Sequence, residues 1–402
     1  MSPNDVVLCS ALRSPIGRFQ GTLSAVRPDD LLARLFEAVI SDSDLDASQI
    51  DEVFAGCANQ AGEDNRNIAR MSTLLAGIPQ HVPAVTVNRL CASGLEAVVQ
   101  AYRSAKCGDG HLFLAGGVES MSRAPYVMPR GPQMPKAGNL TTYDTSLGWR
   151  FPNPKMEAMF PLEAMGCTAE NIVEEMGITR EDQDIFALGS HTKALSAQSD
   201  GAFDNEIVPI SIPQRKRDPI AFSKDEGPRA GSTIEKLASL RAAFRNGGSV
   251  TAGNSSTLND GAAAVIVCTR QTALDHNLTP MAKIHSAASA GVDPTTMGFG
   301  PVPATQIALK RAGMIVSDLD LIELNEAFAA QSLGVIRKLG LKEDIVNVHG
   351  GAIALGHPLG CSGTRILTTL LHAMERHNKN VGLATLCVGV GQGVSMIVER
   401  ES

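Results

Sequence analysis

The sequence predicts an α/β protein made of two similar halves with a long insertion between them. Short apolar stretches alternate with amphipathic stretches of helical period, which favours mostly parallel sheets covered by helices. A weak internal repeat aligns Ser93-Gly94 with Ser362-Gly363 and, without a gap, Ala115 with Ala384. The same order of helix, acidic loop, strand, turn and helix recurs around both positions. A chain of 402 residues is long enough for several domains, so the repeat indicates two α/β halves.

The expected elements follow from these patterns. We expect strands at residues 6–9, 53–56, 84–87, 112–115, 262–268, 321–324 and 383–387. We expect helices at residues 29–40, 95–106, 305–312 and 364–376.

The segment between the halves differs in composition. Residues 120–250 contain many prolines and the only tryptophan, Trp149, followed by two expected helices at 168–176 and 180–199. Thr179 and Asp182 form a capping signal before the second of these helices. Such a long insertion is more typical of a binding lid than of an idle loop. We therefore expect residues 1–119 and 251–270 to form an N-terminal half, 120–250 an inserted loop domain and 271–402 a C-terminal half.

Composition excludes several classes of function. The net charge of −7 argues against a nucleic-acid partner, and no apolar run approaches the roughly 18 residues of a membrane helix. The N-terminus has no secretory signal pattern, so the cytoplasm is the expected location. The eight cysteines contain no C-x-x-C pair, which predicts neither a zinc site nor a disulfide scaffold.

Cys91 is the first candidate for chemistry. It follows a β-rich run and precedes a helical segment, where backbone N–H groups and the helix dipole favour a thiolate. The same N–H groups could receive an oxyanion once the sulfur is acylated. Small neighbours, Ala92, Ser93 and Gly94, leave room for a substrate. The alternative is a buried structural cysteine in a turn.

Three later segments supply further candidates. His357 lies in a glycine-rich loop and precedes Pro358, and imidazole is the usual group that activates a thiol. Cys387 ends the last long apolar strand before another glycine-rich turn. Asn325 follows an expected strand, where its amide could meet an oxyanion or simply cap a helix. Each residue has a structural alternative, but all lie at the ends of strands where open α/β sheets bind ligands.

Together these segments resemble the thiolase family. Residues 87–94, 325–329, 350–358 and 387–393 are similar to its four signatures, in the same order. The resemblance implies two thiolase half-folds packed as a layered αβαβα core, and a ping-pong transfer of an acyl group between Cys91 and coenzyme A (CoA). It also implies that His357 takes the proton from Cys91 and that Cys387 moves a proton at the α-carbon. Asn325 with His357 would form one oxyanion site, and the N–H groups of Cys91 and Gly389 the other.

The resemblance also implies the ligands. Acyl-CoA and CoA are substrates, no cofactor or metal is expected, and the chain is expected to form a homodimer or homotetramer. Ser256 matches a pantetheine contact, and Arg229 matches a contact near the adenine. A local basic run in the insertion could meet the phosphates or form a solvated face; it comprises Arg215, Lys216, Arg217, Lys224 and Arg229.

Some positions bear on the substrate. Ala164 stands where acetoacetyl-CoA-forming thiolases typically carry histidine, and His349 stands where many relatives carry asparagine. Residues 56–66, 119–126 and 147–151 resemble those of bacterial 3-oxoadipyl-CoA thiolases. A dicarboxylic substrate would need a cation for its far carboxylate. The candidates are Arg66, Arg123, Arg130 and Arg150.

Several functions remain open from the sequence. The main expectation is CoA-dependent cleavage of a 3-oxoacyl-CoA, as in fatty-acid β-oxidation. Alternatives within the family are acetoacetyl-CoA formation and 3-oxoadipyl-CoA cleavage in the degradation of aromatic compounds. A carrier-protein ketosynthase would usually pair its cysteine with two histidines and lack Cys387. A non-catalytic CoA-binding relative would have no reason to keep the four chemical groups together.

Overall fold

A computed structural model describes residues 2–131 and 136–401. Its main sheet contains β1 (Val6–Arg13), β2 (Gly17–Arg18), β3 (Glu52–Gly56), β4 (Ala84–Val87), β5 (Leu112–Ser120), β10 (Asn259–Thr269), β11 (Pro280–Gly291), β12 (Leu321–Leu324), β13 (Val381–Val388) and β14 (Gln392–Arg400). Two small hairpins pair β6 (Tyr126–Val127) with β7 (Tyr143–Asp144) and β8 (Ile210–Gln214) with β9 (Arg217–Phe222).

The helices connect these strands. They are α1 (Pro28–Asp42), α2 (Ile68–Leu75), α3 (Ser93–Cys107), α4 (Pro154–Met159), α5 (Met165–Met176), α6 (Arg180–Ser199), α7 (Ile234–Ala238), α8 (Arg270–Asp275), α9 (Pro301–Ala312), α10 (Ala329–Leu339), α11 (Ala352–Leu355) and α12 (Leu359–Arg376). Every strand and helix expected from the sequence is present, most of them longer at the ends. No helix within the described ranges is both long and apolar enough to cross a membrane.

The sheet repeats one arrangement twice. Its order is β12-β13-β14-β11-β1-β10-β5-β3-β4, and the pairing of β1 with β11 joins the two halves. In the first half β3 is parallel to β4 and β5, while β5 is antiparallel to β10. In the second half β12 is parallel to β13, and β13 is antiparallel to β14. The internal repeat in the sequence therefore corresponds to two halves of similar topology.

The expectation of mostly parallel sheets is wrong. Among the described strands of the main sheet, three pairings are parallel and six are antiparallel. The tight turn between β13 and β14 explains one of the reversals. Val390 (φ 64°) and Gly391 (φ 80°) both adopt the left-handed conformation in the three-residue loop between the paired Val388 and Gln392, and so short a loop joins only antiparallel strands.

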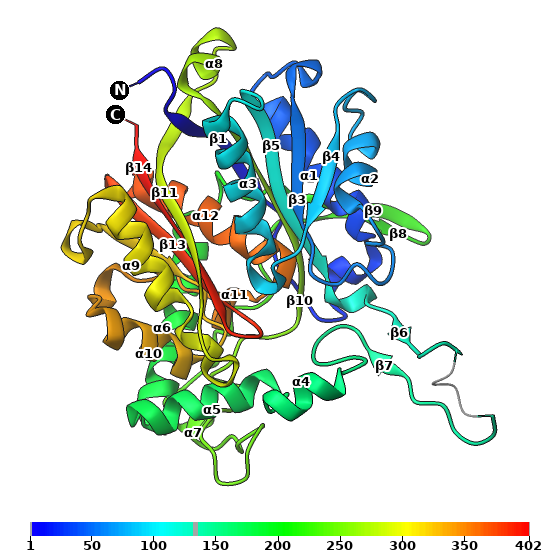
Figure 1. The fold of residues 1–402 in the computed structure, drawn as a ribbon, viewed down its shortest axis with the longest axis vertical. Coiled ribbons are helices and arrows are strands. Elements are labelled where there is room, and N and C mark those ends of the chain that lie inside the picture. The colour runs from blue at the N-terminus through cyan, green and yellow to red at the C-terminus, as the bar shows by residue number, and fades with distance from the viewer. Residues whose placement is uncertain (1, 132–135, 402) are drawn as a thin grey trace.

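The elements stack in five layers (Figure 1). Helices α3 and α12 lie side by side at the centre, where they share one apolar core with residues from both halves of the sheet. Helices α1 and α2 cover the outer face of the first half, and α9 and α10 cover that of the second. This is the αβαβα order expected from the sequence, and it buries most of both central helices.

Glycines allow the two central helices to begin in close contact. A Cβ atom on Gly94 would lie 2.7 Å from the carbonyl oxygen of Gly360, and one on Gly363 would collide with the backbone of Leu95. The small residues after Cys91 and Cys361 are therefore required by packing. They bring the turn of Cys91 against the first turn of α12.

The insertion carries α4 to α7 and both small hairpins. Thr179 and Asp182 form the expected capping box at the start of α6. Strand β10, which follows the insertion, lies between β1 and β5 in the first half of the sheet. The exact domain boundaries given above remain predictions.

Candidate active site

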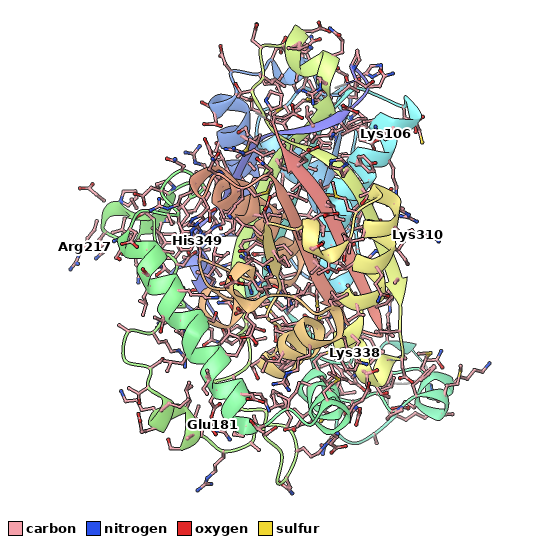
Figure 2. The ribbon with its side chains drawn as sticks, turned by 90° about the vertical axis from the view of Figure 1, so that its left-hand side faces the viewer. Lys106, Glu181, Arg217, Lys310, Lys338 and His349 are labelled. Atoms are coloured by element: carbon pink, nitrogen blue, oxygen red, sulfur yellow. The ribbon has the colours of Figure 1, made fainter. Side chains whose placement is uncertain are left out.

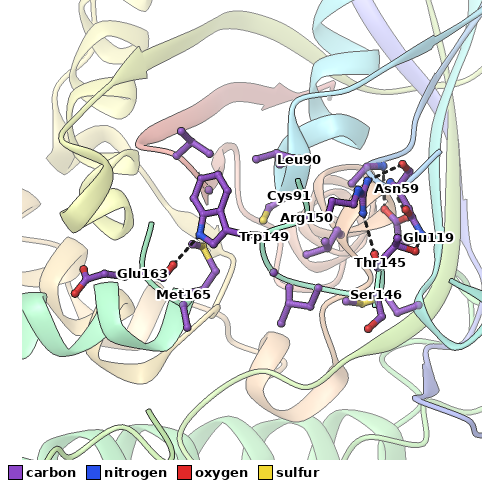
Figure 3. A pocket seen from close by; sticks show the side chains of 18 residues that line it. Asn59, Leu90, Cys91, Glu119, Thr145, Ser146, Trp149, Arg150, Glu163 and Met165 are labelled. Carbon is purple, nitrogen blue, oxygen red and sulfur yellow. Dashed lines mark hydrogen bonds between the residues drawn. The ribbon is translucent and has the colours of Figure 1, made fainter. Parts of the chain in front are cut away.

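Cys91 lies at a pocket of about 260 Å³ formed by loops from both halves and from the insertion. Figure 3 shows Cys91 with Trp149 on one side and with Arg150 and Glu119 on the other. Most of the lining surface is apolar, and Leu90, Ala164, Met165 and Val390 contribute to it. The pocket could therefore hold a short acyl chain beside the thiol.

The turn that presents Cys91 is strained and firmly held. Leu90 has a φ of 46°, which is unfavourable for a residue with a Cβ atom. Its N–H donates to Oδ1 of Asn88 (2.9 Å), and its carbonyl accepts from Oγ of Ser93 (2.7 Å). Val390, also in the left-handed region, lines the same pocket. Two uncommon backbone conformations therefore meet at one thiol.

Burial raises the pKa of Cys91 to about 11, although the backbone N–H groups of Gly389 and of Cys91 itself act to lower it. The backbone N–H groups act in the direction expected from the sequence, but burial has the larger effect. The N–H donors are in place, but loss of hydration outweighs them, so the resting thiol is protonated at neutral pH. Attack by this sulfur needs a base.

Cys387 lies close to Cys91. It is buried near the end of β13, and burial together with the nearby Cys91 thiol raises its pKa. Like Cys91, it holds its proton at neutral pH. The two thiols come from different places in the two halves, Cys91 from the turn between β4 and α3 and Cys387 from the end of β13.

His357 is held in one orientation by its backbone and by one ring nitrogen. Its backbone N–H donates to Oδ1 of Asn259 (3.0 Å), and its Nδ1 lies 2.6 Å from Oγ of Ser362. In the arrangement in which the Ser362 hydroxyl donates its proton to the carbonyl of Pro358 (2.8 Å), Nδ1–H donates to Ser362. Nε2 is then left with a lone pair, which is the form that a general base needs.

The histidine is also neutral. Burial, and then the charge of Arg365, lower the pKa of His357 to about 3. The Nδ2 of Asn325 lies 3.4 Å from both ring nitrogens, and its Oδ1 is buried without a hydrogen-bond partner among the described residues. This amide oxygen is therefore an acceptor available to a further polar group, such as a water or a substrate.

Glu119 is a pocket residue that sequence reasoning left without a role. Its carboxylate accepts the N–H groups of Ala58 (2.9 Å), Asn59 (3.2 Å) and Gly360 (2.8 Å), which ties the first half to the start of α12. Burial raises its pKa to about 7, and the neighbouring Asp64 adds to this shift. The available signal was an acidic residue near the end of a fully buried strand.

The structure separates the four candidate arginines. Arg150 alone lines the pocket of Cys91. Arg123 forms an ion pair with Glu63, and Arg66 and Arg130 are exposed outside the pocket. Sequence alone could not make this distinction, because all four lie in irregular segments.

The residues expected to contact CoA lie outside the pocket lining. Ser256 is half-buried, and its N–H donates to the carbonyl of Ala327 (3.0 Å). Arg229 is exposed, while its N–H donates to Nδ1 of His191 (3.3 Å). The basic run extends into solvent, as Arg217 does in Figure 2. Their roles toward CoA remain predictions.

His349 is buried and does not line the pocket of Cys91. Its Nε2 is 3.0 Å from Nε2 of His377, and its ring meets the edge of Phe203. Burial, together with the positive charges that His377 and Arg376 can carry, lowers the pKa of His349 to about 4, although Glu206 opposes this shift.

We expect the variant His349→Asn to reduce the acid sensitivity of folding. A histidine with an unfolded pKa near 6.5 and a folded pKa near 4 binds its proton only after unfolding, so stability is lost as the pH falls from about 6.5 to about 4. Removing it should shrink the difference in unfolding free energy between pH 7 and pH 5 by about 2 kcal/mol. Urea unfolding at both pH values measures this. The exposed control His111→Asn should leave the difference unchanged, and an equal change in both variants would contradict the assignment.

Comparison with known proteins decides the family. The family model described as "Thiolase, N-terminal domain" matches residues 6–271, and "Thiolase, C-terminal domain" matches residues 278–400. The chain belongs to the thiolase family. It is therefore an acyltransferase that acts on CoA thioesters, as the resemblance in the sequence implied.

Known relatives align with this chain over nearly its full length. The 3-oxoadipyl-CoA/3-oxo-5,6-dehydrosuberyl-CoA thiolase of Escherichia coli is 52% identical over 98% of this chain and 99% of its own. An acetyl-CoA acetyltransferase of Pseudomonas aeruginosa is 49% identical over 99% and 100%. The crystal structure of the Bacillus anthracis acetyl-CoA acetyltransferase superposes with a TM-score of 0.94 at 42% identity, covering 99% of both chains. Human mitochondrial 3-ketoacyl-CoA thiolase gives 0.93 at 36% identity and full coverage.

Proposed function

We propose that this thiolase carries the acyl group on Cys91 and cleaves a 3-oxoacyl-CoA at the expense of free CoA. The sulfur of Cys91 attacks the 3-oxo carbon, the bond between carbons 2 and 3 breaks, and acetyl-CoA leaves after carbon 2 gains a proton. The thiol of a second CoA then attacks the acyl-Cys91 thioester, which regenerates the enzyme. The observation that carries this proposal is the Cys91 thiol, which lies with Gly389 in the wall of a pocket built by both halves.

The neighbouring groups suit distinct steps. We propose that Nε2 of His357 takes the proton of Cys91, because the imidazole is neutral and the thiol is protonated at rest. Cys387 supplies the proton to carbon 2, since its buried thiol keeps that proton at neutral pH. The N–H groups of Cys91 and Gly389 stabilise one oxyanion, and Asn325 with His357 stabilises the other.

The remaining assignments complete the proposal. CoA acts as a substrate and no separate cofactor is required, with Ser256 and Arg229 contacting its pantetheine and adenine ends. The active form is a homodimer or homotetramer in the cytoplasm. These assignments follow the family resemblance.

Among 3-oxoacyl-CoAs we propose 3-oxoadipyl-CoA, and hence a role in aromatic degradation rather than fatty-acid β-oxidation. Relatives at 50–52% identity over nearly the whole chain are named for this substrate or for β-ketoadipyl-CoA. Acetoacetyl-CoA formation is the second candidate, because another relative is named acetyl-CoA acetyltransferase. Ala164 argues against this second candidate. It lines the pocket, and enzymes that form acetoacetyl-CoA typically carry histidine at this position.

Dependence on free CoA tests the reaction. The purified protein should consume a 3-oxoacyl-CoA only when CoA is added and should release one acetyl-CoA with each shortened acyl-CoA. Chromatography of the thioesters measures both products. Loss of substrate without added CoA, with free acid as product, would indicate a hydrolase and contradict the proposal.

A further inference from the structure

We infer that Arg150 binds the terminal carboxylate of the acyl chain and thereby selects dicarboxylic 3-oxoacyl-CoA substrates. This inference rests on the proposed function, since it concerns the acyl chain that Cys91 would carry. It assigns the recognition of that chain to one side chain of the inserted segment.

Arg150 is held in place by neutral partners. Its Nη1 donates to the carbonyl of Thr145 (3.2 Å) and its Nη2 to the carbonyl of Asn59 (3.1 Å). No carboxylate among the described residues lies within ion-pairing distance of its guanidinium. Two of its five N–H donors are thus used for positioning, and its full positive charge is left for a ligand.

The other charges of the pocket do not neutralise Arg150. Glu119 is occupied by three backbone N–H groups, and Glu163 accepts from Asn171 (2.8 Å) and faces Arg245 at 3.8 Å. Arg150 is the one cationic side chain lining this pocket in the part of the chain that the structure describes. An arginine without an acidic partner beside a reactive thiol favours an anionic substrate group.

The positive charge of the pocket lies at one end (Figure 3). Asn59, Thr145 and Glu119 cluster around Arg150 on one side of Cys91, whereas Trp149 and Met165 lie on the other (Figure 3). The buried Oδ1 of Asn59 has no hydrogen-bond partner among the described residues. The end with Arg150 is therefore the cationic end, where the carboxylate would sit, and Glu163 lies on the opposite side (Figure 3).

In the proposed substrate the terminal carboxylate lies close to the carbon that Cys91 attacks. In 3-oxoadipyl-CoA only two methylene groups separate the carbon attacked by Cys91 from the terminal carboxylate. A cation that recognises this carboxylate must therefore lie in the same pocket as the thiol, as Arg150 does. A guanidinium presents parallel N–H donors to both oxygens of a carboxylate, a geometry that lysine cannot reproduce.

Two substrates of equal chain length test the inference. The values of kcat/KM for 3-oxoadipyl-CoA and 3-oxohexanoyl-CoA are measured for the wild type, Arg150→Gln, Arg150→Lys and the exposed control Arg66→Gln. The wild type should prefer 3-oxoadipyl-CoA. In Arg150→Gln the ratio of the two kcat/KM values should fall about 10- to 100-fold, as expected for lost hydrogen bonds to a charged group. Arg150→Lys should give an intermediate ratio, and Arg66→Gln the wild-type ratio.

The possible outcomes are distinct. A parallel fall on both substrates would show that Arg150 only supports its loop, and an unchanged ratio would show that it does not contact the acyl chain; either overturns the inference. A wild type that prefers 3-oxohexanoyl-CoA also overturns it while leaving the thiolase reaction intact. A wild type that cleaves neither substrate with added CoA would instead contradict the proposed function.

Discussion

Replacing Cys91 by alanine is expected to lower kcat/KM for CoA-dependent cleavage by about 10⁴-fold or more. Removal of a catalytic nucleophile has effects of this order, because oxyanion donors and binding alone retain only a small part of the rate enhancement. The fold should survive, since Cys91 is half-buried at the wall of an open pocket. Steady-state kinetics and a thermal unfolding curve on the same preparation check both parts.

A second cysteine provides the control. Cys107 ends the same helix, α3, and its side chain is exposed. Cys107→Ala should therefore keep wild-type kinetics and stability. Substantial activity in Cys91→Ala, or an equal loss in Cys107→Ala, would mean that another group carries the acyl chain.

Replacing His357 by glutamine is expected to lower kcat by about 10²- to 10⁴-fold, the usual contribution of a general base. The Cys91 thiol has a pKa near 11, so only a small fraction would ionise without help at neutral pH. Glutamine keeps a polar side chain of similar size but cannot accept the proton. Single-turnover measurements of Cys91 acylation would locate the loss in the first chemical step.

The pH profile of the wild type gives an independent test of the same residue. Burial lowers the pKa of His357 to about 3, so the base should stay unprotonated from pH 5 upward. We therefore expect no inflection near pH 6.5 in kcat/KM that is attributable to this histidine. An inflection near pH 6.5 in the wild type that disappears in His357→Gln would show that the imidazole is far better hydrated than the structure indicates.

Much of the fold followed from local patterns. Apolar runs such as residues 112–115 and 262–268 predicted strands, and the repeat predicted two halves because equivalent residues must pack in equivalent ways. Whether neighbouring strands pair in parallel or antiparallel fashion did not follow from these local patterns. The direction depends on the hairpin turn at Val390 and Gly391 and on the return of the chain after the insertion, and neither leaves a periodic signal.

The site was predictable only in its chemical groups. Cys91, His357, Asn325 and Cys387 were named because their residue types and glycine-rich surroundings suit acyl transfer. The orientation of His357 depends on Ser362 and Asn259, and Asn259 lies nearly a hundred residues away in sequence. The balance that keeps the thiol protonated depends on burial, which no short motif specifies.

Acyl transfer onto Cys91 is the central claim, and peptide mapping tests it most directly. The protein is mixed with acetyl-CoA in the absence of other acceptors, quenched in acid and digested with trypsin. Cleavage after Arg89 and Arg103 yields a peptide of residues 90–103 in which Cys91 is the only cysteine. An acetyl group on this peptide, absent from Cys91→Ala, is the predicted result. Acetylation of another cysteine peptide, or of none while the enzyme still turns over, would contradict the account.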